Sequence, residues 1–167
     1  MGMTDWLDRW FGCINDWNDT LSKFIEDKNF DSHGMTTRIQ WHQDFGQAVA
    51  SAVTRNVPIM LVVHATDCRS CKSFREWFSR SSGVIELSQH FSAVALAPED
   101  VPNDVHQLES DGAYVPRVMF LVPKGPKVLL VKEGARKQAE EGQKHFFPGT
   151  TPLLESMRAV LANWPKY

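Results

Sequence analysis

Hydrophobic and polar residues follow a helical period near the start of the chain. Between residues 4 and about 27, large apolar side chains recur every three or four positions, which predicts an amphipathic helix. They are Trp6, Leu7, Trp10, Phe11, Ile14, Trp17, Leu21, Phe24 and Ile25. The opposite face is mostly acidic, which disfavours an anionic membrane surface. We therefore expect this helix to dock on the rest of the protein or on a second copy, giving a homodimer.

Turn-forming residues between positions 29 and 37 interrupt the helical period. We place a boundary there, with an N-terminal helix and linker at 1–37 and a second domain at 38–167. In that domain the apolar segments alternate between strand length and helix length. The predicted elements are a short strand at 39–41, a helix at 44–56, a strand at 57–63, helices at 72–78 and after Ser81 or Ser82, a strand at 91–96, strands at 118–122 and 127–131, and a helix at 151–163.

The apolar pattern also predicts how these elements pack. The strand at 57–63 is apolar without alternation, so we expect it to be covered on both faces. Pro123 and Gly125 fall between the last two strands and indicate a hairpin. The helix at 44–56 is expected to bury Phe45, Ala48, Val49, Ala52 and Val53. The polar segments 99–111 and 132–144 are predicted to be loops. A parallel unit that leads into an antiparallel hairpin predicts an α/β thioredoxin-like fold, a central mixed sheet flanked by helices.

Composition narrows the classes of function. The chain has 167 residues, 43% of them hydrophobic, and a formal net charge of −2, so it carries no broad basic surface for nucleic acid. Its longest apolar run is strand-sized, and we therefore expect no integral membrane segment. Three cysteines are too few for a disulfide-stapled scaffold, and only two of them lie close together.

Those two, Cys68 and Cys71, stand between the strand at 57–63 and the following helix. A cysteine at a helix start lies beside unpaired backbone N–H groups, whose partial positive charge favours the thiolate. The thiolate is the form that attacks a disulfide. We therefore predict a thiol–disulfide oxidoreductase acting on protein disulfides, with Cys68 as nucleophile and Cys71 as resolving cysteine. This chemistry needs no cofactor.

Other interpretations of the pair are a stable disulfide and half of a zinc site. Zinc would need two further ligands, and the sequence has no second Cys-x-x-Cys and no paired histidines, so we predict no metal site. A different class of function stays open, because a fold does not determine activity. In that alternative the protein binds clients or signals without catalysis, and tethers its partners through Cys68.

A second motif precedes the hairpin, and with the cysteine pair it carries a family resemblance. The matching stretches are Asp67-Cys68-Arg69-Ser70-Cys71-Lys72, Ile85 to Phe91, and Asp111-Gly112-Ala113-Tyr114-Val115-Pro116-Arg117 with the apolar residues that follow. Over about residues 39–164 the chain resembles the small thioredoxin-like proteins of the endoplasmic reticulum. These are the anterior gradient proteins and a related single-domain oxidoreductase; two cysteines place the chain nearer the latter.

The resemblance implies that Pro116 is a cis-proline and that Tyr114, Val115 and Pro116 form the substrate-binding loop. Val115 would offer its backbone to an extended chain. The implied partners are proteins or peptides with disulfides or thiols. The implied location is the lumen of the endoplasmic reticulum or the outside of the cell. The chain shows neither a secretory signal nor a retention signal, so the cytoplasm stays open.

Several residues depart from the family pattern. Asp67 stands where the family oxidoreductase has tryptophan, and its charge opposes a Cys68 thiolate, whereas Arg69 and Lys72 favour it. Arg117 is a further candidate for modulating the sulfur site, or else a surface residue. Val62 occupies the position of the buried aspartate of thioredoxin. Cys71 therefore lacks an obvious proton acceptor, unless His64 or a water serves, and slow resolution of mixed disulfides is expected.

Overall fold

The computed structural model describes residues 34–108, 111–136 and 142–167. The amphipathic helix expected at 4–27 lies outside the described residues, and so do Cys13 and most of the linker. The division at residue 37 and the expected homodimer therefore stay predictions. Among the helices in the described ranges, none is both long and apolar enough to cross a bilayer.

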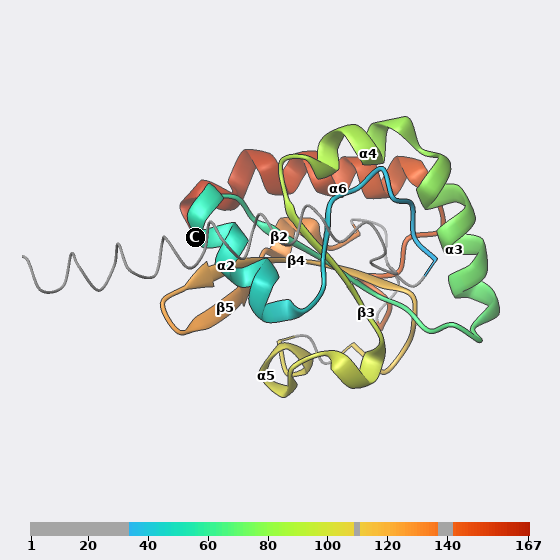
Figure 1. Cartoon of the computed structure of the whole chain (residues 1–167), viewed down its shortest axis with the longest axis horizontal. Coiled ribbons are helices and arrows are strands. Elements are labelled where there is room, and N and C mark those ends of the chain that lie inside the picture. The colour runs from blue at the N-terminus through green and yellow to red at the C-terminus, as the bar shows by residue number, and fades with distance from the viewer. Residues whose placement is uncertain (1–33, 109–110, 137–141) are drawn as a thin grey trace, which may run out of the picture. The chain divides into compact units, whose positions relative to one another are not determined.

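The described residues build a mixed sheet of five strands (Figure 1). In chain order these are β1 (Trp41–His42), β2 (Ile59–Val63), β3 (Ser92–Leu96), β4 (Arg117–Lys124) and β5 (Lys127–Leu130). Their order across the sheet is β1-β3-β2-β4-β5, with β3 parallel to both β1 and β2. β4 runs antiparallel to β2, and β5 antiparallel to β4. The predicted thioredoxin-like architecture is confirmed, and all five residues of β2 are buried at its centre.

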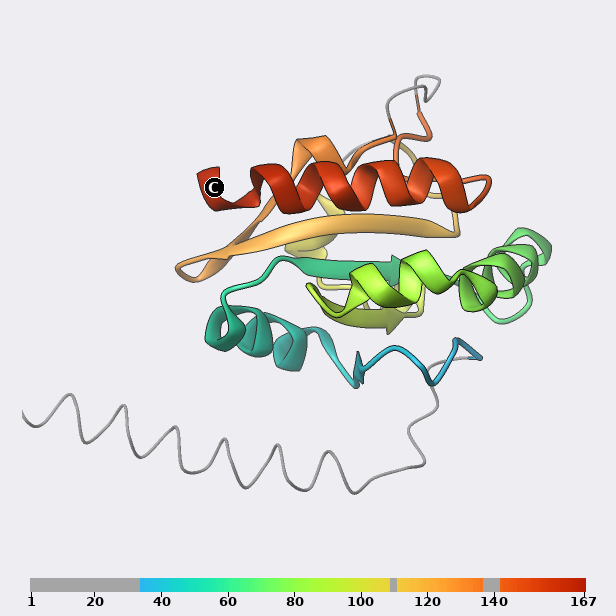
Figure 2. The ribbon, with the colours of Figure 1, turned by 90° about the horizontal axis from the view of Figure 1, so that it is seen from above.

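Helices cover both faces of this sheet. They are α2 (Phe45–Arg55), α3 (Arg69–Arg80), α4 (Ser82–Ser88), α5 (Asn103–His106) and α6 (Thr150–Asn163). Figure 2 shows α6 on one side of the sheet and α2 on the other. Ile59, Leu61 and Val63 of β2 share one apolar cluster with Ala48 and Ala52 of α2. The alternating residues of β2 therefore face the opposite layer, and burial on both faces fits a strand without alternation.

Two predicted details of the α2 face and the acidic loop were wrong. Val53 is 60% exposed, because α2 turns Ala48, Ser51 and Ala52 toward the sheet instead. Small side chains allow a close approach, and the Ser92 hydroxyl donates to the Ala48 carbonyl at 2.7 Å. The acidic segment is also not all loop, since it contains the short helix α5, whose Val105 is fully buried.

The start of α3 differs from its prediction in a way that matters for the site. Sequence periodicity placed the helix start at Lys72, but the helix begins at Arg69. Cys68 is its N-cap residue, and the Cys68 sulfur accepts a hydrogen bond from the backbone N–H of Cys71. A sulfur replaces the usual capping oxygen here, which is why capping preferences did not locate the boundary.

Candidate active site

Cys68 lies where the chain leaves the central strand β2 and enters α3. Its Sγ is 3.2 Å from the Cys71 backbone nitrogen and 3.2 Å from the Ser70 Oγ. The residue is half-buried, and both cysteines are free thiols. Burial by itself would raise the pKa of Cys68, but hydrogen bonds from Cys71 and Ser70 outweigh it and lower that pKa below its ordinary 9.0. The site therefore favours the Cys68 thiolate.

Cys71 differs from Cys68 in both burial and pKa. It is fully buried in the first turn of α3, and burial is the largest cause that raises its pKa to about 11. The hydrogen bond to Cys68 adds to this rise, whereas the Ala65 N–H, 3.4 Å from the Cys71 Sγ, lowers the pKa. At neutral pH the outer sulfur is thus the better nucleophile and the inner sulfur holds its proton.

Arg75 ties the strand-to-helix connection to α3. Its Nη1 donates to the Ala65 carbonyl at 3.1 Å and its Nη2 to the Thr66 carbonyl at 3.4 Å. The same Nη1 lies 3.2 Å from Nδ1 of His64, which is buried. Since Ala65 donates to Cys71, the guanidinium fixes the segment that contacts the inner sulfur, and its charge also lowers the Cys71 pKa. Sequence reasoning missed Arg75, although its position one helical turn after Cys71 was a usable signal.

The charged residues predicted to modulate the pair lie around it on the surface. Asp67, Arg69 and Lys72 are all exposed. The leading interactions that lower the pKa of Cys68 come from Cys71 and Ser70. Ser70 is therefore a second site residue that sequence reasoning missed, and modulation by the three charged residues stays a prediction. No group of three or more His, Cys, Asp or Glu side chains in the described part of the chain could hold a metal ion.

The loop that contains Val115 and Pro116 lies next to Cys68 at the end of the sheet. The Val115–Pro116 peptide bond is cis, the geometry that the family resemblance implies. The Cys68 Sγ lies 3.9 Å from the Val115 carbonyl oxygen, and the Ser70 Oγ lies 3.4 Å from the same oxygen. The fold therefore brings the two predicted motifs together, and a polypeptide bound along Val115 would pass beside the Cys68 sulfur.

Tyr114 anchors this loop to the segment before α6. Its hydroxyl donates to Asp111 Oδ2 at 2.6 Å and accepts the His145 backbone N–H at 3.0 Å. The Lys144 backbone N–H donates to the same carboxylate oxygen at 2.9 Å. Burial and, after it, the bond to Asp111 raise the pKa of Tyr114. The hydroxyl is thus engaged in two hydrogen bonds within the protein.

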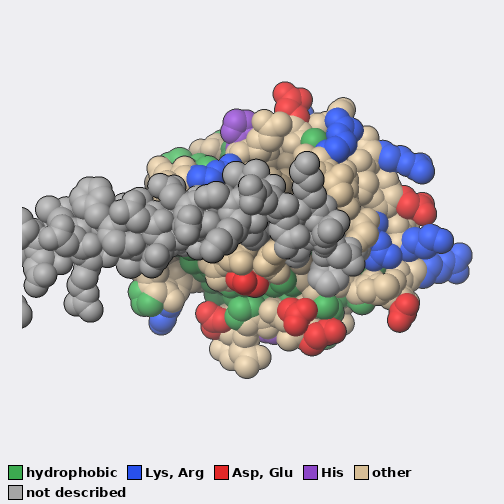
Figure 3. All heavy atoms as spheres, in the orientation of Figure 1, with side chains coloured by type: hydrophobic (Ala, Val, Ile, Leu, Met, Phe, Trp, Pro, Cys, Tyr) green, Lys and Arg blue, Asp and Glu red, His purple; other side chains and the backbone are tan. Residues whose placement is uncertain are grey.

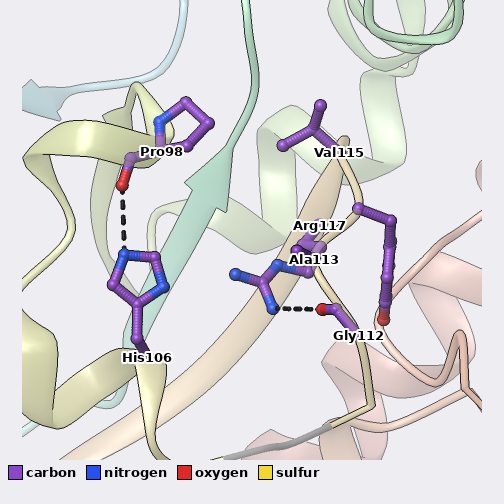
Figure 4. A pocket seen from close by; sticks show the side chains of 7 residues that line it. Pro98, His106, Gly112, Ala113, Val115 and Arg117 are labelled. Atoms are coloured by element: carbon purple, nitrogen blue, oxygen red, sulfur yellow. Dashed lines mark hydrogen bonds between the residues drawn. The ribbon is translucent and has the colours of Figure 1, made fainter.

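Arg117 is buried, so the interpretation as a surface residue was wrong. Its guanidinium carbon lies 5.5 Å from the centre of the Tyr114 ring, and its Nη1 donates to the Gly112 carbonyl at 3.4 Å. Figure 4 shows the guanidinium turned along the loop toward Gly112. These contacts hold the loop at one wall of a cavity of about 410 Å³. The cavity is lined by Pro98, His106, Gly112, Ala113, Tyr114, Val115 and Arg117.

Tyr114→Phe should destabilise the protein by about 1–3 kcal/mol, because it removes a hydroxyl that satisfies a carboxylate and a backbone N–H. Urea unfolding followed by circular dichroism would measure this loss. Tyr167→Phe is the matched control, since that hydroxyl contacts Glu133 and the Lys132 N–H near the chain end and is more exposed to solvent. Equal losses in the two variants would contradict an anchoring role for Tyr114.

Comparisons with known proteins agree with this architecture. Residues 40–123 match the family model described as thioredoxin-like. Anterior gradient protein 3 of Xenopus tropicalis is 33% identical over 132 residues, covering 78% of this chain and 76% of that protein. The human anterior gradient protein 2 homolog is 30% identical over 131 residues, covering 78% and 71%.

The solved thioredoxin of Thermus thermophilus superposes with a TM-score of 0.55 at 17% identity, covering 76% of this chain and 90% of that one. At this identity the likeness concerns the fold alone. The family model and the anterior gradient relatives also show the family to which the chain belongs. The chain belongs to the thioredoxin-like family, among the anterior gradient proteins and their relatives.

Proposed function

We propose that the protein is a thiol–disulfide oxidoreductase that acts on protein or peptide disulfides through Cys68 and Cys71. The thioredoxin-like domain and the anterior gradient relatives support a redox or disulfide-related function in general. The specific assignment of catalysis to Cys68 and Cys71 rests on the difference in burial and pKa between the two thiols. Cys68 is half-buried at a helix cap with a lowered pKa, whereas Cys71 is fully buried with a raised one.

In the first step the Cys68 thiolate attacks one sulfur of the substrate disulfide. A bond forms between Cys68 and that sulfur, the substrate disulfide breaks, and the other substrate sulfur leaves as a thiolate. The Cys71 backbone N–H, which contacts the Cys68 sulfur, stabilises negative charge there before the attack. We assign substrate binding to Tyr114, Val115 and Pro116, with the client chain extended along the backbone of Val115.

In the second step Cys71 loses its proton to solvent, and its thiolate attacks the Cys68 sulfur. The Cys68–Cys71 disulfide forms, and the second substrate thiolate leaves. Two electrons have then passed from the protein dithiol to the substrate, and a thiol reductant restores the dithiol. The reverse sequence oxidises a substrate, and alternating both directions isomerises its disulfides. We place this chemistry in the lumen of the endoplasmic reticulum or outside the cell, where disulfides persist.

One observation favours a second candidate function. Cys71 is buried and its pKa is about 11, so it releases a mixed disulfide slowly. A protein with slow release would hold clients through Cys68 rather than turn them over. Both functions use the same outer sulfur, and they differ in the lifetime of the mixed disulfide.

Turnover of insulin disulfides with glutathione as reductant tests the proposed enzyme. The full-length protein should accelerate reduction, and Cys68→Ser should lower the rate about a hundredfold or more, to the uncatalysed background. Cys13→Ser is the matched control, because it removes the remaining cysteine with the same substitution, and its rate should stay unchanged. Background rates for the unmodified protein, or full activity in Cys68→Ser, would contradict the proposal.

A further inference from the structure

Two hollows lie end to end along α3, starting at the cysteine site. The first has a volume of about 450 Å³ and the second about 700 Å³. They share Ser73 and Trp77, so they adjoin each other along α3 and are here named together the α3 groove. The first hollow is lined by Arg69, Ser70, Ser73, Phe74, Trp77, Phe146, Phe147 and Pro148. The second is lined by Ser73, Glu76, Trp77, Arg80, Ser81, Ser82, Gly83, Thr150 and Leu154.

The middle of the α3 groove is aromatic. Phe74 and Phe147 are each only 2% exposed and form its buried floor in the first hollow. Trp77 packs edge-on against Phe74, with ring centres 5.0 Å apart, and stays half-exposed. Since Trp77 lines both hollows, its free surface is available to an apolar side chain at the centre of the groove.

The rim of the α3 groove has a net positive charge. Its charged lining residues are Arg69, Arg80 and the acidic Glu76, whereas Lys72 and Arg75 of the same helix do not line it. Arg69 and Arg80 are exposed and lie at opposite ends of the groove. Figure 3 shows basic side chains, with some acidic ones among them, at the end of the molecule where α3 lies, and acidic ones below, around α5. The whole chain has a net charge of −2, so this basic surface is local and complements acidic side chains.

We propose that the α3 groove binds the segment of a client polypeptide beside its reactive cysteine, and selects acidic and aromatic residues in that segment. The inference rests on the proposed function, since it takes Cys68 to be the residue that joins the client. Ser70 contacts the Cys68 sulfur and also lines the groove, so the groove is continuous with the reaction site. From Arg69 to Arg80 the helix rises about 16 Å. An extended chain covers that length with about five residues.

The expected register follows from the order of the lining residues. An acidic residue lies next to the client cysteine and faces Arg69. An aromatic or large aliphatic residue sits about three positions from the cysteine, over Trp77. A second acidic residue lies about two positions further and faces Arg80. A client chain with basic residues at the two acidic positions is repelled.

The test uses the reduced full-length protein and peptides whose single cysteine carries thionitrobenzoate. Attack by Cys68 on the peptide sulfur releases thionitrobenzoate, which is followed by its colour. One peptide carries Asp-Ser-Trp-Ser-Asp beside the cysteine and the other Lys-Ser-Ser-Ser-Lys, each placed once before and once after it. The acidic and aromatic peptide should react about tenfold faster in one of the two orientations. The preference should shrink as salt rises, because exposed charges are screened.

Three variants test which residues cause the preference for the acidic and aromatic peptide. Arg80→Glu and Trp77→Ser should each reduce the tenfold preference to about threefold or less. Lys124→Glu makes the same change of charge at an exposed position of the β4–β5 hairpin and should leave the preference intact. Arg80 is exposed, so Arg80→Glu keeps the test independent of any packing that Trp77→Ser disturbs. All three variants should react normally with dithiodipyridine, an uncharged disulfide that has no flanking residues.

Equal rates for the two peptides would overturn the proposal, as would a preference that survives both groove variants or falls in Lys124→Glu. A preference that vanishes as protein concentration rises would assign the groove to a second copy of the chain and would overturn it too. Failure of the proposed function looks different. In that case dithiodipyridine and both peptides would react no faster with the unmodified protein than with Cys68→Ser.

Discussion

Replacing Cys71 with serine should turn the protein into a trap that stays covalently joined to its substrate. The N–H that contacts the Cys68 sulfur belongs to the backbone of residue 71, so the serine variant keeps it and Cys68 still attacks. Resolution then depends on external thiols rather than on a neighbouring sulfur, which should lower turnover about a hundredfold. Mixed disulfides separated without reductant on a denaturing gel measure the trap.

The acidity of Cys71 adds a pH dependence to this experiment. A thiol with a raised pKa is protonated at neutral pH, and its thiolate fraction grows about tenfold with each pH unit below that pKa. In the mixed disulfide the bond to the Cys68 thiolate is gone, but burial, the largest cause of the raised pKa, remains. The rate of resolution in the unmodified protein should therefore rise about tenfold per unit from pH 7 to 9. Attack by Cys68 should depend less steeply on pH over that range, because hydrogen bonds lower the pKa of Cys68.

Quenched single-turnover reactions separate the two rates, and the double variant Cys68→Ser/Cys71→Ser supplies the background. If the unmodified protein and Cys71→Ser accumulate equal amounts of mixed disulfide, Cys71 does not resolve it. That result would favour the tethering function. A resolution rate independent of pH would show that proton loss from Cys71 does not limit release.

Arg75→Gln should slow resolution of the mixed disulfide at pH 7, because it raises the pKa of Cys71. The guanidinium charge lowers that pKa, so removing it raises the pKa and shifts the pH profile of resolution to higher pH. The variant also loses bonds to the Ala65 and Thr66 carbonyls, which should cost about 1–2 kcal/mol of folding free energy.

Arg75→Lys separates the charge from the backbone contacts. Lysine keeps the charge but lacks the planar group that reaches two carbonyls, so its pH profile should stay close to that of arginine while stability falls. Arg80→Gln makes the same change as Arg75→Gln on the exposed side of α3 and should leave the profile unmoved. A normal pH profile in Arg75→Gln would limit Arg75 to a structural role.

The sequence determined the order of the strands along the chain and placed the cysteine pair between a strand and a helix. The apolar run that becomes β2 has no alternation because both of its faces are covered. The residue types alone were therefore enough to predict this burial. Cys68 was proposed as the nucleophile because a cysteine at a helix start lies beside unpaired backbone N–H groups. The cis geometry at Pro116 came from family resemblance rather than from periodicity or composition.

Tertiary structure alone decided what surrounds those residues. The Cys68 sulfur and the Val115 carbonyl are 47 positions apart in the chain, and Tyr114 meets His145 across 31 positions. Periodicity describes neighbours on one element, so it could not show that Arg117 is buried, that Val53 is exposed, or that Trp77 lines two hollows along α3. These features arise where separate elements meet, because burial and pKa depend on every group packed around a side chain.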